Sequence, residues 1–269
     1  MLKSIIILLI GFLLFSVCYS YGDDFWVTIL CYHKIIPQNN ITNKLDNNDE
    51  SEYSKKTDLI VSAENFERQM KFIKESYSVI SLKDFIEHMD LKKTLDSNSV
   101  VITFDDGDKS IYTYAYPILK KYNIPTTVFI YTNVAKEKRG LNWDEIKEMS
   151  NNGIDFGSHT ISHCNLVKKL NNETHNEYEE RIKKELVDSK KIIEEKTGKE
   201  IEYLAYPYGE YDEFVKDEAI KLGYKATLIV KWGKNYVSRS KYDLKRRIVC
   251  GKYTMKEFID IFRTNTKNE

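Results

Sequence analysis

Short apolar runs alternate along the chain with stretches in which apolar residues recur every three or four positions. The short runs have the length of buried strands, and the others have the spacing of one helix face. Strands are predicted at Val27–Cys31, Ser78–Ser81, Val100–Phe104, Thr126–Tyr131, Ile154–Phe156, Tyr203–Tyr206, Ala226–Val230 and Arg247–Cys250. Helices are predicted around Phe66–Ile73, Phe85–Met89, Tyr112–Tyr122, Ile182–Ile193 and Phe258–Phe262. This alternation predicts an α/β protein with a mainly parallel sheet, either open or closed into a barrel.

The first residues have the pattern of a secretory signal. Lys3 precedes an apolar run from Ile5 to Val17, and small residues follow at Ser20 and Gly22. As a helix this run spans only ~20 Å, which is shorter than the ~30 Å hydrocarbon core of a bilayer. We therefore predict a signal peptide at residues 1–22 and one domain at residues 23–269. An uncleaved anchor, or lipidation at Cys18, is the alternative.

Composition adds constraints on the remaining chain. Lys and Arg number 41 and Asp and Glu number 41 among 269 residues, so no basic surface for nucleic acid is predicted. A polar tract at about residues 38–58 predicts a mobile surface loop. Cys31, Cys164 and Cys250 are widely spaced and odd in number, which predicts free thiols rather than a disulfide framework.

Polar residues collect directly after four of the predicted strands. They are Tyr32-His33, Asp105-Asp106-Gly107, the segment Gly157 to His163, and Pro207-Tyr208-Gly209. In parallel α/β folds the carboxyl ends of the strands meet at one rim, where active sites are assembled. These distant segments are therefore expected to converge on one site.

The chemistry of these residues suggests a metal site. His159 and His163 are four residues apart and can face one cation if the segment forms a helical turn. One carboxylate of the pair Asp105 and Asp106 would complete the ligand set, and the other would remain free as a base. Each motif alone has an ordinary explanation, the histidines as surface or core residues and Asp-Asp-Gly as a turn. Their joint position at strand ends favours the metal site.

Two of these motifs resemble those of a known family. Thr103-Phe104-Asp105-Asp106-Gly107, together with Ser158-His159-Thr160-Ile161-Ser162-His163, resembles the polysaccharide deacetylases of carbohydrate esterase family 4. The resemblance extends from about Val27 to Phe262. It implies an irregular (β/α)7-type barrel in a single domain. It also implies that Asp105 is the catalytic base and that Asp106, His159 and His163 hold a divalent metal, usually zinc.

The third motif of the family ordinarily reads Arg-x-Pro-x-Gly, and here it reads Ala205-Tyr206-Pro207-Tyr208-Gly209. The arginine that steadies the base in relatives is thus replaced by Ala205, and Arg246 or Arg247 is a candidate substitute. By resemblance, the backbone N–H of Tyr208 would help to stabilise the oxyanion. The usual late Leu-x-x-His, which supplies the general acid, is absent, because no histidine follows His175.

One subgroup of the family accounts for both departures. The exported deacetylases of biofilm poly-β-1,6-N-acetyl-D-glucosamine carry an early Tyr-His and a Tyr-Pro-Tyr-Gly third motif. Leu30-Cys31-Tyr32-His33-Lys34-Ile35 is similar to the first of these, which makes His33 the implied acid. A buried structural histidine is the alternative for His33.

The family resemblance, together with the signal pattern and the metal-type residues, implies an exported, metal-dependent N-deacetylase, with zinc as the expected metal. Its expected partner is an N-acetylglucosamine polysaccharide, with poly-β-1,6-N-acetylglucosamine preferred, and its expected location is secreted or peripheral to the cell envelope. The alternatives are a peptidoglycan or chitooligosaccharide deacetylase and a non-catalytic sugar-binding module on the same fold.

Overall fold

The computed structural model describes residues 25–45 and 58–263; for residues 42–45 it describes the backbone only. The predicted signal at residues 1–22 therefore lies outside the described residues. Of the polar tract expected to be a loop, the first part is a short helix, α1 (Gln38–Leu45), and residues 46–57 lie outside the description. No helix in the described ranges is both long enough and apolar enough to cross a bilayer.

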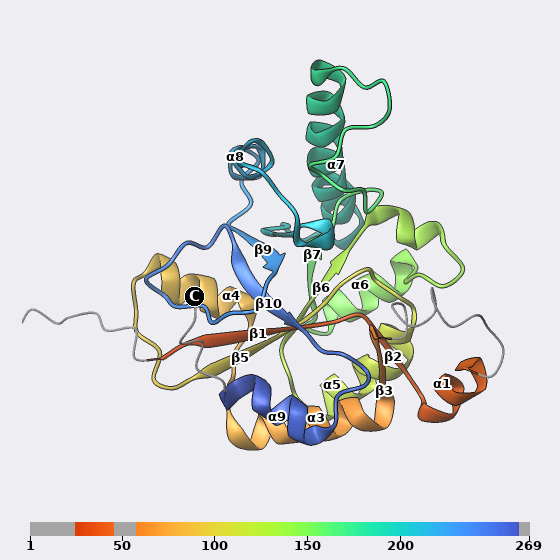
Figure 1. The fold of residues 1–269 in the computed structure, drawn as a ribbon, viewed down its shortest axis with the longest axis vertical. Helices are drawn as coiled ribbons and strands as arrows, with labels where there is room; N and C mark the ends of the chain where they lie inside the picture. Colours follow the sequence, from red (N-terminus) through yellow and green to blue (C-terminus); the bar gives the residue numbers. More distant parts are fainter. Residues whose placement is uncertain (1–24, 46–57, 264–269) are drawn as a thin grey trace, which may run out of the picture.

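Seven parallel strands close into a barrel, which confirms the predicted fold (Figure 1). In order around the barrel they are β1 (Val27–Tyr32), β10 (Leu244–Ile248), β9 (Ala226–Val230), β8 (Tyr203–Ala205), β7 (Asp155–Ser158), β6 (Thr126–Ile130) and β5 (Ser99–Phe104). Pairing of β1 with β5 closes the ring, and β4 (Ser78–Val79) adds to the start of β5. A separate pair, β2 (Lys34–Ile36) and β3 (Ile60–Ser62), was not predicted.

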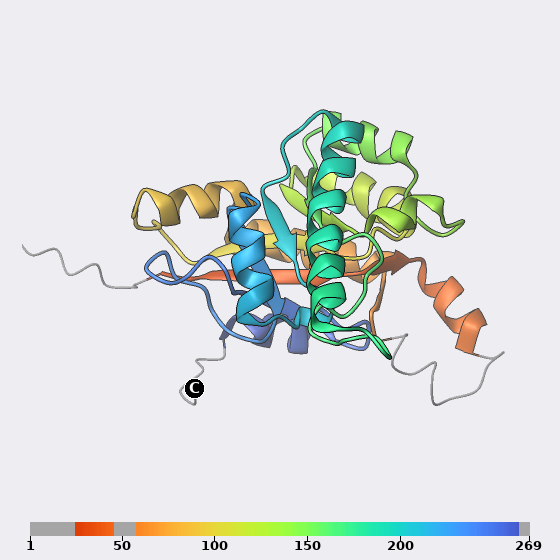
Figure 2. The same cartoon turned by 90° about the horizontal axis from the view of Figure 1, so that it is seen from above.

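Helices surround this barrel (Figures 1 and 2). They are α3 (Ala63–Ser76), α4 (Leu82–Asp90), α5 (Tyr116–Tyr122), α6 (Trp143–Asn151), α7 (His175–Thr197), α8 (Glu213–Lys221) and α9 (Met255–Arg263). Several begin at capping boxes: Ser81 with Asp84 starts α4, and Thr174 with Glu177 starts α7. The helices α6 and α8 were not predicted, because each buries only two apolar side chains, whereas α4, of the same length, buries four.

Alternation along the strands separates two apolar clusters. On β1, Val27 and Ile29 belong to a cluster that α4 also joins, whereas Leu30 and Tyr32 pack outward against the other helices. Figure 2 shows α4 beside the amino ends of β1 and β5. Apolar residues and α4 thus fill one end of the barrel, which leaves the carboxyl end for polar side chains.

The strand predicted at Arg247–Cys250 begins earlier than expected. In the structure β10 is Leu244–Ile248. Val249 lies just beyond the strand, where its N–H donates to Cys31 O of β1. The first part of the strand contains the charged run Lys245-Arg246-Arg247, so the apolar pattern predicts a strand that starts too late in the chain. The cause is a buried arginine inside the barrel, Arg246, which is 1% exposed.

Candidate active site

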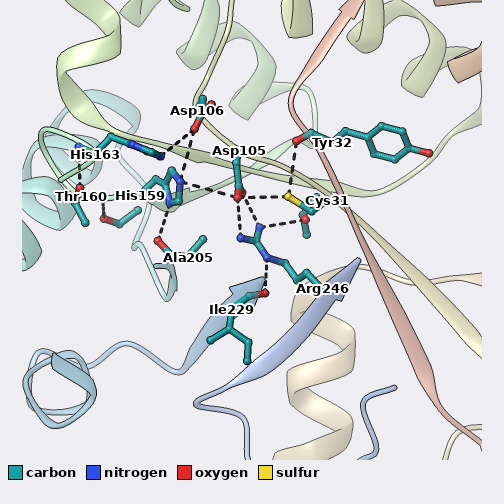
Figure 3. A network of polar contacts seen from close by, with 12 residues as sticks. Cys31, Tyr32, Asp105, Asp106, His159, Thr160, His163, Ala205, Ile229 and Arg246 are labelled. Carbon is teal, nitrogen blue, oxygen red and sulfur yellow. Dashed lines mark hydrogen bonds and ion pairs between the residues drawn. The ribbon is translucent and has the colours of Figure 1, made fainter. Parts of the chain in front are cut away.

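The residues that the sequence singled out follow the carboxyl ends of the strands, and Figure 3 shows four of them close together: Asp105, Asp106, His159 and His163. His33 follows β1, Asp105 and Asp106 follow β5, His159 and His163 follow β7, and Tyr208 lies in a short turn after β8. Residues more than a hundred positions apart therefore share one site, as the strand-end argument predicts.

Asp106, His159 and His163 form a group with the spacing of metal ligands. Asp106 Oδ1 lies 3.3 Å from His163 Nε2 and 3.7 Å from His159 Nε2. Ligands about 2.1 Å from a tetrahedral zinc ion are separated by about 3.4 Å, so these three atoms fit around one cation. Asp106 Oδ1 is also buried without a hydrogen-bond partner. A buried carboxylate oxygen that faces two imidazoles in this way fits a bound cation.

A backbone carbonyl fixes the orientation of His159. Its Nδ1 lies 2.7 Å from Ala205 O, and because a carbonyl only accepts, Nδ1 must carry the proton. The Nε2 lone pair is then directed towards Asp106, as metal ligation requires. Burial lowers the pKa of His159, which favours the same neutral form.

The histidine segment is not the helical turn that the sequence analysis expected. Thr160 and His163 both have left-handed backbone angles, with φ of 71° and 58°. His163 N–H donates to Thr160 Oγ1, which closes a compact non-helical loop. Such conformations cost about 1–3 kcal/mol each in non-glycine residues and persist only when neighbouring contacts hold them. The imidazoles of His159 and His163 are therefore brought together by a strained loop and not by a helical turn.

The turn after β5 is strained as well. Asp106 and Gly107 both have φ of 71°. A Cβ added at Gly107 would lie 2.9 Å from Ile130 Cγ2, so glycine is needed there for space as well as for its backbone angles. This double left-handed turn sends consecutive carboxylates in different directions. Asp106 is directed towards the histidines, and Asp105 is directed into the barrel (Figure 3).

Asp105 is buried and paired with Arg246. Arg246 Nη1 donates to Asp105 Oδ1 at 2.6 Å and Nη2 donates to Oδ2 at 2.7 Å. Burial alone would raise the pKa of Asp105, but the Arg246 guanidinium and the nearby imidazoles hold it well below its ordinary value. Asp105 is therefore ionised at any pH at which an enzyme would work.

Arg246 is therefore the one of the two candidate arginines that pairs with Asp105. Of the two substitutes that the sequence suggested, Arg247 points elsewhere: its guanidinium lies 4.8 Å from the Trp232 ring centroid and bonds to Tyr253 Oη. Arg246 is on β10, which follows the third motif by some forty residues. Only closure of the barrel brings it to Asp105.

Cys31 is a contact of Asp105 that the sequence analysis did not predict. Its Sγ lies 3.4 Å from Asp105 Oδ2, and burial raises the pKa of this thiol, which keeps it protonated as a donor. All three cysteines in the described residues are free thiols, as predicted, but only Cys31 is fully buried.

His33 lies close to the same carboxylate. Donor atoms of His33, Cys31 and Asp105 fall within 4.8 Å of one another. Both oxygens of Asp105 already bind the Arg246 cation, so this second group does not fit a metal ion. The Nδ1 of His33 is buried without a partner in the described part of the chain, which leaves it available for a substrate atom.

Tyr208 borders the metal-type group from the β8 side. Its ring centroid lies 4.9 Å from that of His163, and the residue is 60% exposed. Its backbone is left-handed, with φ of 63°. Gly209 follows at φ of 73°, and a Cβ there would lie 2.4 Å from Val230 N. The turn is therefore pressed against β9 with Tyr208 at the rim.

These features define a class of protein: a parallel β/α barrel with a two-histidine, one-carboxylate group beside a buried Asp–Arg pair. The chain belongs to the polysaccharide deacetylase family, whose pattern matches residues 92–227, just over half of the sequence. A relative is the poly-β-1,6-N-acetyl-D-glucosamine N-deacetylase of Staphylococcus aureus (strain MRSA252), which is 36% identical over 175 residues. The match includes 61% of this chain and 60% of the length of that relative.

Solved structures agree on the fold. The Bacillus cereus polysaccharide deacetylase BC0361 is 27% identical and superimposes with a TM-score of 0.69, covering 88% of this chain and 68% of that one. The Streptococcus pyogenes deacetylase PplD, in complex with acetate, gives a TM-score of 0.73 at 24% identity, covering 88% and 97%. At 24% identity, the similarity to PplD is evidence for the fold alone.

Proposed function

We propose that this protein is an exported, metal-dependent N-deacetylase that removes acetyl groups from the N-acetylglucosamine residues of an extracellular polysaccharide. The observation that carries the proposal is the metal-type group of Asp106, His159 and His163 beside an ionised, arginine-held Asp105. The 36% identical relative named for poly-β-1,6-N-acetyl-D-glucosamine supports that polymer as the substrate.

Each residue of the site has a part in amide hydrolysis. Asp105 accepts the proton of the attacking water, while Arg246 keeps Asp105 ionised and oriented. Because its low pKa makes Asp105 a weak base, the water must be acidified, and a divalent metal held by Asp106, His159 and His163 would supply that acidity and polarise the acetamide carbonyl.

Two further groups act on the substrate side. The Tyr208 N–H donates to the acetamide oxygen, on which negative charge develops as the water attacks the carbonyl carbon. His33 then protonates the departing amine as the C–N bond breaks. The products are acetate and a glucosamine residue.

Acetate release from β-1,6- and β-1,4-linked N-acetylglucosamine oligomers, measured side by side, tests the proposal. We expect faster release from the β-1,6 oligomer, loss of activity after chelation, and recovery when zinc is added back. The Arg246 cation cannot replace the metal at the carbonyl, because its guanidinium is already paired with both oxygens of Asp105. Faster release from the β-1,4 oligomer would instead identify a chitooligosaccharide- or peptidoglycan-type enzyme. Binding of oligomers without acetate release at any metal content would identify a sugar-binding module.

Replacing His33 with glutamine tests the proposed acid. We expect acetate release from the oligomer to fall by about 10²- to 10⁴-fold, the usual contribution of a positioned proton donor. Hydrolysis of 4-nitrophenyl acetate should be largely retained, since a phenolate leaves without a proton. A variant that loses both activities equally would assign His33 to another role.

Export rests on the pattern of residues 1–22, with Lys3 before an apolar run. We place the mature protein outside the cytoplasm, secreted or held at the cell envelope. Intact mass of the native protein tests this placement: a mass that includes all of residues 1–22 would contradict cleavage.

A further inference from the structure

We propose that Glu185 on α7 is a positioning residue that shapes the His159–His163 loop for metal binding. Its carboxylate is buried against this loop, although it belongs to a helix that contributes no predicted ligand. The inference rests on the proposed metal site and adds to it a residue that acts through the loop backbone.

The Glu185 carboxylate accepts three hydrogen bonds from the two residues in the middle of the loop. Oε2 accepts from Ile161 N–H at 2.8 Å and from Ser162 N–H at 3.1 Å. Oε1 accepts from Ser162 Oγ at 2.7 Å. Charge-assisted bonds of this kind are about twice as strong as neutral ones. Both donors lie between the two imidazoles in sequence, so Glu185 acts on the segment that sets their separation.

The opposite side of the loop is held by the segment after β6. Thr132 N–H donates to Thr160 O, and Asn133 N–H donates to Ile161 O, both at 3.0 Å. The loop is therefore clamped between this segment and α7. Its carbonyl groups are bound on one side and its N–H groups on the other.

The two histidines depend on this clamp to different degrees. His159 is fixed on its own, because its N–H donates to Ile130 O at 2.8 Å and its ring bonds to Ala205 O. His163 lies beyond the strained Thr160, and within the described residues its backbone is held only by the local bond from its N–H to Thr160 Oγ1. Its ring contacts the rings of Tyr131 and Tyr208. The distance from His163 to Asp106 is consequently the one that Glu185 controls.

Hydrogen bonding and charge are separable at this position. Glutamine in place of Glu185 keeps an oxygen for the two backbone N–H groups, and its NH₂ can donate to Ser162 Oγ, since a hydroxyl also accepts. Alanine removes every bond. Aspartate keeps the charge but is shorter by one methylene, so it cannot reach the loop equally well.

Zinc affinity of the apo protein, measured by competition with a chromophoric chelator, tests the inference without reliance on activity. We expect Glu185→Ala and Glu185→Asp to bind zinc about 10- to 100-fold more weakly, as is typical when a group supporting a ligand is lost. Glu185→Gln should restore most of the affinity. The control is Glu195→Ala on the same helix. The Glu195 carboxylate is exposed, so this substitution should leave the zinc affinity unchanged.

Several outcomes would overturn the inference. Parental affinity in folded Glu185→Ala and Glu185→Asp would show that the loop needs no such anchor, and a Gln variant as weak as Ala would assign the effect to charge. If the alanine variant does not fold, the aspartate variant decides alone. Failure of the parent protein to bind zinc would be a different result, because it refutes the proposed metal site itself.

Discussion

Replacing Asp105 with asparagine is expected to lower the kcat for acetate release by about 10²- to 10⁴-fold while the protein still binds one zinc ion. Asparagine has nearly the same shape and keeps one oxygen for Arg246, but it cannot accept a proton from water. Asp105 lies outside the metal-type group, because both of its oxygens face Arg246. The measurement is acetate released per zinc-loaded protein, together with the zinc content.

Asp106→Asn is the matched control, since it changes the adjacent carboxylate in the same way. Asp106 Oδ1 faces both imidazoles, so this variant should lose zinc as well as rate. If Asp105→Asn released acetate as fast as the parent, the assignment of the base would be wrong. If it lost zinc as Asp106→Asn does, Asp105 would be a ligand and the division of labour between the two carboxylates would be reversed.

The sequence was sufficient to predict the parallel β/α sheet and its polar rim, because both follow from local patterns. Seven of the eight predicted strands lie close to the observed ones, and each polar segment follows a strand that ends at the rim. Closure by pairing of β1 with β5 followed from the family resemblance, not from periodicity, which allowed an open sheet equally well.

Long-range and backbone features were harder to predict. Arg246 is 141 residues from Asp105 along the chain, and no local pattern distinguishes it from Arg247. The loop from His159 to His163 departs from a helical turn through left-handed residues that an i, i+4 spacing does not specify. Glu185 did carry a signal, since it lies beside Ile182 and Leu186 on the buried face of α7. A charged residue on an apolar helix face indicates a buried polar partner.

Replacing Arg246 with methionine is expected to reduce the free energy of unfolding by about 3–5 kcal/mol, because it leaves the Asp105 charge buried and unpaired. Methionine fills much of the same volume, so a cavity contributes little to this loss. For a domain of this size the Tm should fall by about 6–20 °C. Arg247→Met is the control. Arg247 is half-buried against Trp232, and within the part of the chain that the structure describes its side chain bonds only to Tyr253 Oη, so the loss should be much smaller.

The pH dependence of the unfolding free energy shows whether the loss of stability in Arg246→Met comes from the unpaired charge of Asp105. In the parent, Arg246 lowers the pKa of Asp105 in the folded state, so the stability contributed by the pair is present at neutral pH and is lost only as the pH falls through strongly acid values. Arg246→Met removes the strongest of the charges that oppose burial and leaves the nearby imidazoles. The pKa of Asp105 therefore rises, and the folded variant takes up a proton as the pH falls. The difference in unfolding free energy between parent and variant should therefore be largest near pH 7–8 and should narrow towards pH 5. Denaturant unfolding at each pH measures it, and a difference that stays constant would show that Arg246 stabilises the barrel by packing rather than by its charge.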